Sequence, residues 1–500
     1  MEKSLIIIGG GLAGLAAGCY GRMNGYRTSI FEMHDKVGGV CTGWKRKGYT
    51  IDGGMLWLMG TKPGTPCYNY WEELGVAQKW KVINHDQWDL IEDESGKVFH
   101  VYSDIDRLER QMMELAPEDE SAIREYTKAI RDSMRIDMSE DKPQELYGII
   151  DYIKMFKMLP FLRFIRKWGE ITTADYYRNF KNPLLRKAIN IDPTGELADE
   201  PMFGVFLVFA FLHQRAAGYV IGGDLALNSY IQKRYLQLGG ELYLKSRVEK
   251  VLVENDKAVG IRLADGTKHR VDIVISAADG HTTIYNMLDG KYIDDKMRGY
   301  YDNLPLYPPL VYIGLGVARK FDDVPSSAEG LNFPLEKPVT IAGKEHTTLT
   351  VQIYNFDPTL APEGKTLVRV MFHTDYDYWE RLYKEPERYK EEKEQIADKV
   401  VAILDKRFPG LATQVEMRDV ATPMTWVRYT GNWRGAYEGW RRNTETPRQM
   451  SKTLPGLDNF YMAGQWVRPG GGMPAAVTSG RHTIQIICKK DKKKFVTSIP

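Results

Sequence analysis

The sequence predicts an α/β fold whose nucleotide-binding domain is assembled from separate stretches of the chain, and three features support this prediction. An apolar run at residues 5–8 leads into Gly9-x-Gly11-x-x-Gly14, which fits a strand, a tight turn and the start of a helix. Glu32 ends the next apolar run, about 20 residues beyond the glycines, where an acid reaches a ribose. Residues 460–480 again fit a strand, a glycine-rich loop and a helix. We expect both ends of the chain to meet at one dinucleotide.

Each glycine of the N-terminal motif has its own task in a Rossmann-like site. Gly9 permits the tight turn, Gly11 lets backbone amides approach a pyrophosphate, and Gly14 lets the helix pack closely on the strand. Unpaired amides and the positive end of the helix dipole then favour the anion at the helix N-terminus. The motif, with its flanking strand, helix and acid, predicts a dinucleotide-binding site.

The composition indicates a globular protein of two to four domains. Its 500 residues are 43% apolar, and 68 basic against 66 acidic residues leave a net charge of +2, so we expect no nucleic-acid partner. Four scattered cysteines predict a reducing cytoplasm, and nine histidines without a His-x-x-x-His pair predict no metal. We expect neither a signal peptide nor a membrane-spanning helix.

The hydrophobic pattern divides the chain into stretches typical of a nucleotide-binding domain and stretches that are not. We assign residues 1–95, 215–295 and 446–500 to the nucleotide-binding domain, 96–214 to a helical substrate or lid region, and 296–445 to a mixed α+β substrate-binding region. Helical patterns occur at 104–115, 118–134, 146–168, 225–238 and 386–406. Strand patterns occur at 241–244, 248–253, 258–263, 271–275, 310–317, 347–354 and 366–373.

The C-terminal glycine-rich segment differs from a plain NAD-binding domain. Pro474 suits the first turn of a helix, and the glycines that end at Gly472 let a flat ring lie against the backbone. A helix N-terminus at this place would stabilise negative charge on a reduced flavin ring. The segment therefore favours a flavin.

Together these segments resemble the phytoene desaturase family of FAD-dependent oxidoreductases, which also includes carotenoid cis-trans isomerases and retinol saturases. The resemblance runs through essentially the whole chain in order. It is carried by Gly9-x-Gly11-x-x-Gly14, Glu32, Val37-Gly38-Gly39, the 48–54 segment ending in Asp52-Gly53-Gly54, Gly222-Gly223, Gly239-Gly240, Val248, Ala463-Gly464-Gln465 and the 469–474 segment. It implies FAD as cofactor and an apolar unsaturated substrate of the carotenoid, retinoid or isoprenoid kind.

The resemblance also implies roles for single residues. Glu32 would bind the adenosine ribose, and Val248 would hold the adenine through its backbone. Residues beside the pyrophosphate and ribityl chain would be Gly464 and Gln465, and those near the isoalloxazine would be Met473 and Pro474. The predicted cofactor-binding set is Gly9, Gly11, Gly14, Glu32, Gly38, Gly39, Gly54, Met55, Val248, Gly464, Gln465, Gly472, Met473 and Pro474.

Two positions depart from the family pattern. Many relatives have arginine where this chain has Val40, and many related flavoproteins have an acid where Gln465 stands. The basic contact to the pyrophosphate is therefore left open, and Lys36 and Arg46 are the residues that could substitute for it. Because no second glycine fingerprint follows a strand, we expect no built-in NADPH domain and an external electron donor or acceptor.

The resemblance leaves several functions open. The first is desaturation or saturation of a carbon–carbon bond by hydride transfer at flavin N5, and the second is cis-trans isomerisation of a polyene with transiently reduced FAD. A flavin-bearing lipid-binding protein without turnover and an amine-oxidase-like enzyme are further alternatives. The sequence contains no convincing acid/base dyad, and Tyr429 is the one weak catalytic candidate.

Some segments have both a functional and a packing interpretation. The aromatic cluster Trp426, Tyr429, Trp433, Tyr437 and Trp440 lines a substrate channel or forms a core, and we favour the channel. We interpret Cys41 as a small buried residue rather than a redox one. The basic amphipathic segment 148–168 either contacts a membrane surface or packs as a lid, which we favour, and the lysine-rich tail 489–494 is expected to be solvated.

Overall fold

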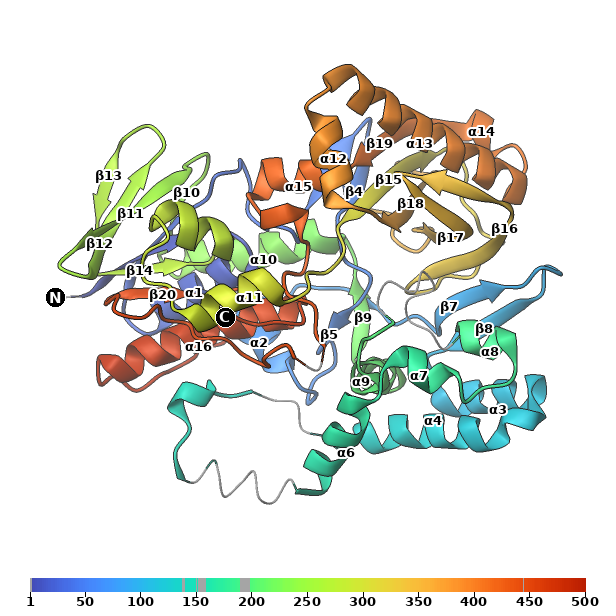
Figure 1. Ribbon diagram of the computed structural model, residues 1–500, viewed down its shortest axis with the longest axis horizontal. Coiled ribbons are helices and arrows are strands. Elements are labelled where there is room, and N and C mark those ends of the chain that lie inside the picture. Colours follow the sequence, from blue (N-terminus) through green and yellow to red (C-terminus); the bar gives the residue numbers. More distant parts are fainter. Residues whose placement is uncertain (1, 137–139, 150, 152–158, 189–197, 444) are drawn as a thin grey trace.

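The computed structural model describes residues 2–136, 140–149, 151, 159–188, 198–443 and 445–500 (Figure 1). Its nucleotide-binding half is built on a five-stranded sheet in which every neighbouring pair is parallel. The strands, in spatial order, are β10 (Glu241–Tyr243), β2 (Arg27–Phe31), β1 (Ser4–Ile8), β14 (Ile273–Ser276) and β20 (Phe460–Met462). One sheet thus unites the N-terminal, middle and C-terminal stretches.

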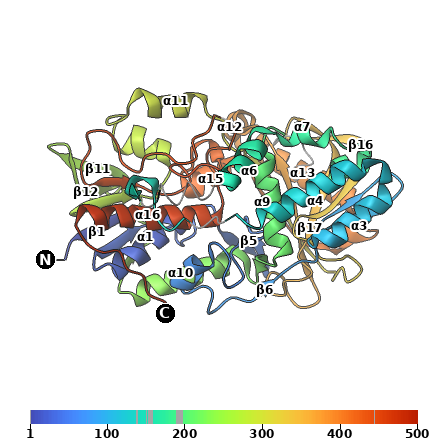
Figure 2. The same cartoon turned by 90° about the horizontal axis from the view of Figure 1, so that it is seen from below.

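Three helices hold this sheet together: α1 (Leu12–Met23), α10 (Gly223–Gln237) and α16 (Met473–Lys490). Figure 2 shows α16 beside α1, and α1 also contacts α10. A Cβ atom on Gly480 of α16 would collide with the carbonyl oxygen of Ala13 in α1, so the two helices approach with backbone against backbone. The structure confirms the helix predicted at 225–238 and the helix predicted in the C-terminal segment.

Smaller elements complete this half. A separate antiparallel sheet contains β11 (Val248–Glu254), β12 (Lys257–Leu263) and β13 (Lys268–Arg270), and it lies near the N-terminus in Figure 1. The remaining elements are β3 (Gly43–Arg46), β4 (Tyr49–Asp52), β5 (Leu58–Met59), α2 (Tyr68–Glu73), β6 (Val82–Ile83), β9 (Ala217–Val220), a π-helix (Thr282–Met287) and α11 (Asp295–Asn303).

The second half contains a seven-stranded sheet covered by helices. Its order is β19 (Val415–Ala421), β15 (Leu310–Val317), β18 (Thr366–His373), β17 (Lys344–Ile353), β16 (Gly330–Ile341), β7 (Gln87–Glu92) and β8 (Val98–Tyr102). The helices α12 (Tyr376–Tyr383), α13 (Pro386–Arg407) and α14 (Leu411–Gln414) lie over it in Figure 1, and α15 (Pro423–Thr430) leads back toward the first half. The predicted strands at 310–317 and 366–373 are confirmed.

The predicted boundary at residue 95 is wrong in one respect. It falls inside the hairpin of β7 and β8, and β7 pairs in parallel with β16, so that Asp89 lies opposite Gly330. These strands therefore belong to the second sheet. The pairing partner is more than 200 residues away, and local periodicity does not contain that information.

A helical layer lies below the second sheet in Figure 1. It contains α3 (Ile105–Leu115), α4 (Glu120–Ser133), α6 (Leu159–Glu170), α7 (Thr173–Tyr177), α8 (Pro183–Ala188) and α9 (Met202–His213). Of the predicted amphipathic segment 148–168, residues 150 and 152–158 lie outside the described residues. In the described part, Phe164 and Trp168 of α6 pack against Phe203 and Phe206 of α9, as a lid would. Across the described ranges, no helix is both long and apolar enough to span a bilayer.

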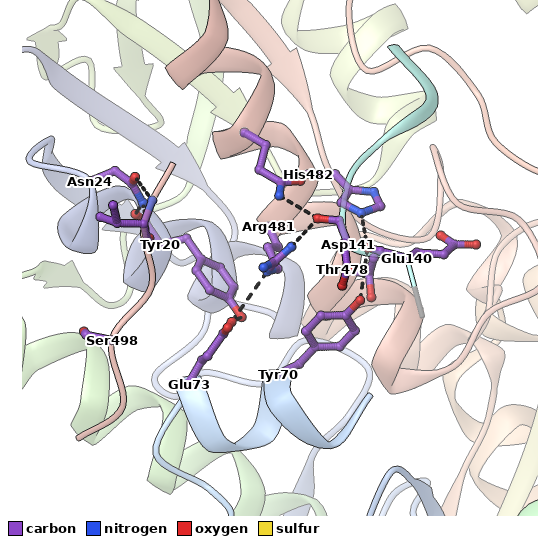
Figure 3. A network of polar contacts seen from close by, with 12 residues as sticks. Tyr20, Asn24, Tyr70, Glu73, Glu140, Asp141, Thr478, Arg481, His482 and Ser498 are labelled. Atoms are coloured by element: carbon purple, nitrogen blue, oxygen red, sulfur yellow. Dashed lines mark hydrogen bonds and ion pairs between the residues drawn. The ribbon is translucent and has the colours of Figure 1, made fainter. Parts of the chain in front are cut away.

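A buried polar network fastens α16 to the lid region (Figure 3). Nη1 of Arg481 donates to the carbonyl oxygen of Asp141 at 2.6 Å, and Nε2 of His482 donates to that of Glu140 at 2.8 Å. The Glu140 carboxylate pairs with Arg468 at 2.5 Å and with Arg448 at 3.0 Å. Burial raises the pKa of Glu140, but these arginines outweigh it and lower that pKa to about 2.

This network makes the fold sensitive to acid. Burial lowers the pKa of His482 to about 3, whereas an unfolded histidine titrates near about 6.5, so below that pH the unfolded chain binds a proton that the folded one does not. His482→Gln keeps an N–H donor but does not titrate. As the pH is lowered from about 6.5 to 4, we expect the free energy of unfolding to fall less steeply in this variant than in the wild type. The difference between the two slopes is up to about 1.4 kcal/mol per pH unit. Urea unfolding at stepped pH measures this, and equal slopes in both proteins would contradict it.

Candidate functional site

One cavity of about 1050 Å³ lies along the carboxyl edge of the first sheet, where parallel α/β sheets bind their ligands. It extends from the antiparallel sheet at Val248 to the C-terminal segment at Gln465. Among the predicted cofactor residues, those that line it are Gly9, Gly11, Glu32, Gly38, Gly39, Val248, Gly464 and Gln465. Residues from three distant stretches of the chain therefore line the same cavity.

The glycine turn between β1 and α1 forms the floor of the cavity. Gly9 has a φ of 97°, which favours glycine, and its amide donates to the carbonyl oxygen of Phe31 at 2.8 Å. A Cβ on Gly14 would collide with the carbonyl oxygen of Gly9, so Gly14 serves close packing and does not line the cavity. A Cβ on Gly11, in contrast, would meet nothing nearer than the carbonyl oxygen of Gly38 at 3.8 Å. The Gly11 position is therefore open toward a ligand.

Glu32 is fixed at the end of β2 by backbone amides. Its Oε2 accepts from the amide of Gly10 at 2.6 Å, and its Oε1 accepts from the amide of His34 at 2.8 Å. The residue is 6% exposed, and burial raises the pKa of its carboxyl while the amides oppose that shift. Each oxygen retains a second lone pair, so the carboxyl can still accept from ribose hydroxyls.

The opposite end of the cavity approaches the N-terminus of α16. Gly470, Gly471 and Gly472 have φ values of 91°, 60° and 89°, and Gly472 is the residue that precedes the helix. Pro474 lies in the first helical turn, as predicted. Gly472, Met473 and Pro474 are not part of the lining of the 1050 Å³ cavity.

Gly54 and Met55, which were predicted to bind the cofactor, also lie outside the cavity lining. Met55 is fully buried, and its amide and that of Gly54 donate to Oδ1 of Asp52 at 3.1 Å and 3.0 Å. The predicted cofactor contact of Met55 is therefore not supported by its position, and neither of the two lines the cavity. Their role in this structure is to shape the turn after β4.

The predicted basic contacts lie elsewhere as well. Lys36 is bonded to the carbonyl oxygen of Gly43, and burial lowers the pKa of its amine. Arg46 is half exposed and pairs with Asp419 at 3.4 Å. Neither lines the cavity. The basic residues in the lining are Arg247, Lys250 and Arg428, which carry no motif spacing that sequence reasoning can detect.

A buried acid that the sequence did not predict, Asp279, follows β14. Its Oδ2 accepts from the amide of Thr282 at 2.6 Å, and its Oδ1 accepts from that of Trp433 at 2.9 Å. Burial raises the pKa of Asp279 to about 6 against these hydrogen bonds. The carboxyl therefore links two walls of the cavity. Its only sequence signal is its place directly after a strand of the nucleotide-binding sheet.

Tyr429, the weak catalytic candidate, lies outside the lining of this cavity. Its side chain is 42% exposed, its ring lies 5.0 Å from that of His34, and it does not contribute to the lining. The predicted aromatic channel is also corrected. Trp440 is fully buried and packs 5.1 Å from Trp466, whereas Trp426 is buried in a different cluster with Tyr312 at 5.3 Å. Both tryptophans belong to packed cores.

Cys41 does line the cavity, next to Gly38 and Gly39. Burial raises the pKa of its thiol well above the ordinary value, and the acids Asp224, Glu438 and Asp52 add to that shift. The thiol therefore stays protonated at neutral pH and is a poor nucleophile, in agreement with the structural interpretation of this residue.

Comparison with known proteins identifies the family. A model described as "Flavin containing amine oxidoreductase" matches residues 12–488, and the chain belongs to this family. The protein is an FAD-dependent oxidoreductase, which confirms the cofactor, the enzyme class and the family resemblance predicted from the sequence.

Two curated relatives align along nearly the whole chain. Chloroplastic prolycopene isomerase of Arabidopsis thaliana is 24% identical over 99% of this chain and 84% of its own length. The lycopene-forming phytoene desaturase of a Paracoccus species is 24% identical over 97% of both chains.

Solved structures share the fold. An oxidoreductase from Methanosarcina mazei superposes with a TM-score of 0.62 at 16% identity, covering 96% of this chain and 100% of its own. Putrescine oxidase bound to putrescine gives a TM-score of 0.55 at 12% identity, covering 98% of this chain and 99% of its own.

The residues present fit FAD. The cavity is large enough for a dinucleotide, the Gly11 position faces it without a side chain, and Glu32 lies at the distance along the chain that a ribose ligand requires. The residues that would hold FAD are the glycine turn at the pyrophosphate, Glu32 at the ribose and the Gly464–Gln465 backbone beyond them.

Two alanine substitutions separate cofactor binding from folding. Gly11→Ala places its methyl group in open space, so we expect the apoprotein to keep its melting temperature while FAD affinity falls about tenfold or more. Gly14→Ala forces the methyl group into the Gly9 carbonyl, so we expect a loss of about 1–3 kcal/mol of stability even without FAD. Thermal unfolding and flavin fluorescence titration measure both effects. Unchanged FAD affinity in Gly11→Ala would show that the pyrophosphate lies elsewhere.

Proposed function

We propose that this enzyme desaturates or saturates a carbon–carbon bond of an apolar polyene of the carotenoid class. The observation that carries the proposal is the end-to-end alignment with relatives named as phytoene desaturases and prolycopene isomerases, at 23–25% identity over 95% of the chain or more. Bound FAD supplies a two-electron hydride acceptor or donor at N5. The protein has to align the substrate, exclude water and balance charge.

The chain's own residues serve these tasks at the C-terminal end of the site. The free amides at the N-terminus of α16 favour negative charge beside the Gly470–Gly472 loop. The protonated Cys41 thiol leaves this region without a competing nucleophile.

Isomerisation is the second candidate, because several relatives carry the name prolycopene isomerase and align over 96–99% of the chain. In that case the bound flavin is needed in its reduced form and no electrons are consumed overall. The mass of the product separates the two candidates, since isomerisation leaves the mass of the substrate unchanged.

Amine oxidation is less well supported. The likeness to putrescine oxidase, at 12% identity, concerns the fold alone. Amine turnover would release peroxide, which is simple to detect. For the carotenoid reaction we propose an external electron partner, since only one nucleotide fingerprint is found in the sequence.

Anaerobic half-reactions test the proposed function. The FAD-loaded enzyme, either oxidised or reduced with dithionite, is mixed with polyenes in detergent, and the flavin spectrum and product mass are followed. We expect one redox form to react with a polyene and to change its mass by two hydrogens. Gly11→Ala serves as a control that has the same fold but little flavin. Failure of every polyene, together with peroxide release from amines, would refute the proposal.

A further inference from the structure

Glu438 lies between two segments that approach the flavin-ring end of the site. A Cβ on Gly471 would be 2.6 Å from the Cβ of Glu438 and 2.7 Å from its Oε2, so this side chain rests directly on the loop that precedes α16. A Cβ on the next residue, Gly439, would be 3.1 Å from Cγ of Gln465, which lines the cofactor cavity. The carboxyl is thereby held at the N-terminal end of α16.

The Glu438 carboxyl is enclosed but not hydrogen-bonded. Its side chain is half-buried, and it has no hydrogen bond or ion pair with another residue in the described part of the chain. Burial raises its pKa to about 7, and the nearby Glu200 adds to this shift. The titratable groups that face it from neighbouring elements are Cys41, Glu200, Tyr307, Tyr312 and Tyr437.

The other buried carboxyls near this end of the site are already engaged. Asp52 accepts from three backbone amides, those of Gly54, Met55 and Asp224. Asp224 is fully buried, and burial together with Asp52 raises the pKa of its carboxyl well above the usual range, so it is a neutral acid without access to a ligand. Asp279 is fixed by two amides. Glu438 does not line the 1050 Å³ cavity, but among these four carboxyls it alone is partly exposed and has unoccupied lone pairs.

We propose that Glu438 is the residue that exchanges a proton with the substrate beside the flavin ring. This inference rests on the proposed function. In desaturation, one carbon of the substrate loses a hydride to the flavin, and the adjacent carbon loses a proton to the Glu438 carboxylate. The electron pair of that second C–H bond becomes the new C=C bond. In saturation, the Glu438 carboxylic acid returns the proton as the hydride arrives. Glu200, hydrogen-bonded to Tyr307, is the next acid along the path of the proton.

A spectroscopic titration without substrate tests the position of Glu438. Oxidised, FAD-loaded protein is titrated from about pH 5 to 9 while the flavin absorption bands are followed. A carboxyl that ionises beside the ring shifts these bands, so we expect a transition with a midpoint near 7 in the wild type. We expect Glu438→Gln to abolish the transition and Glu438→Asp to retain it with a shifted midpoint. Glu363→Gln, which alters an exposed glutamate, is the matched control and should behave as the wild type.

Single-turnover kinetics test the chemistry. We expect Glu438→Gln to slow the reaction between flavin and polyene by about 10²–10⁴-fold and to remove its pH dependence near 7, with partial rescue in Glu438→Asp. If Glu438→Gln reacts at the wild-type rate, or keeps the spectral transition, the assignment is overturned. If Glu438→Gln does not retain FAD, Glu438→Asp provides the test, through the midpoint of its spectral transition and the pH profile of its reaction. Wild-type values for both would overturn the assignment of Glu438. If the wild type reacts with no polyene, the proposed function fails, while loss of the transition in Glu438→Gln still places the carboxyl at the ring.

Discussion

The structure depends on backbone-to-backbone packing around helix α1. Gly14 brings the helix onto the turn after β1, and Gly18 leaves room for the ring of Tyr235 in α10. Gly480 of α16 lies against the Ala13 carbonyl on another side of the helix. Each contact joins α1 to a different stretch of the chain, and each excludes a side chain larger than hydrogen. The same contacts form the fold and hold the open end of α1 toward the cofactor, so folding and cofactor binding share one constraint.

The C-terminal helix extends this constraint to the rest of the molecule. One end of α16 begins at the glycine loop beneath Glu438, and its middle is fixed to the lid region through Arg481 and His482 (Figure 3). Arg468, from the same C-terminal segment, neutralises the buried Glu140. A buried ion pair of this kind is costly to break because each charge would remain without a partner. Residues 140–141 and the C-terminal segment that contains α16 are thus joined by hydrogen bonds and an ion pair.

Local sequence signals predicted the helices and strands that have a clear hydrophobic period. They failed where strand pairing or the tertiary surroundings determine the structure. The strands β15 and β18 and the helix α13 follow their hydrophobic patterns. Strand β16 was missed because Pro334 and Pro338 interrupt its pattern, and the strand indeed shifts register between Pro334 and Val339. Helix α9 is apolar on all sides and so gives no amphipathic signal. The glycine turn and Glu32 were predictable because fixed spacing encodes them, whereas Asp279 and Glu438 are single residues whose surroundings only the tertiary fold determines.

The charge balance of the proposed reaction would explain why one carboxyl is sufficient at the N-terminal end of α16. With the FAD ring bound at this end, hydride transfer to it would add one negative charge, and the N-terminus of α16 would offset about half an elementary charge. An ionised carboxylate beside the ring would oppose this transfer, since two like charges in a weakly polar region repel strongly. In the proposed mechanism, a proton transferred to Glu438 in the same step would remove that repulsion and keep the net charge of the region constant. The charges would balance in both directions, because release of the proton would accompany return of the hydride. Under this proposal the same geometry would serve desaturation and saturation, and an external electron partner would determine which of them proceeds.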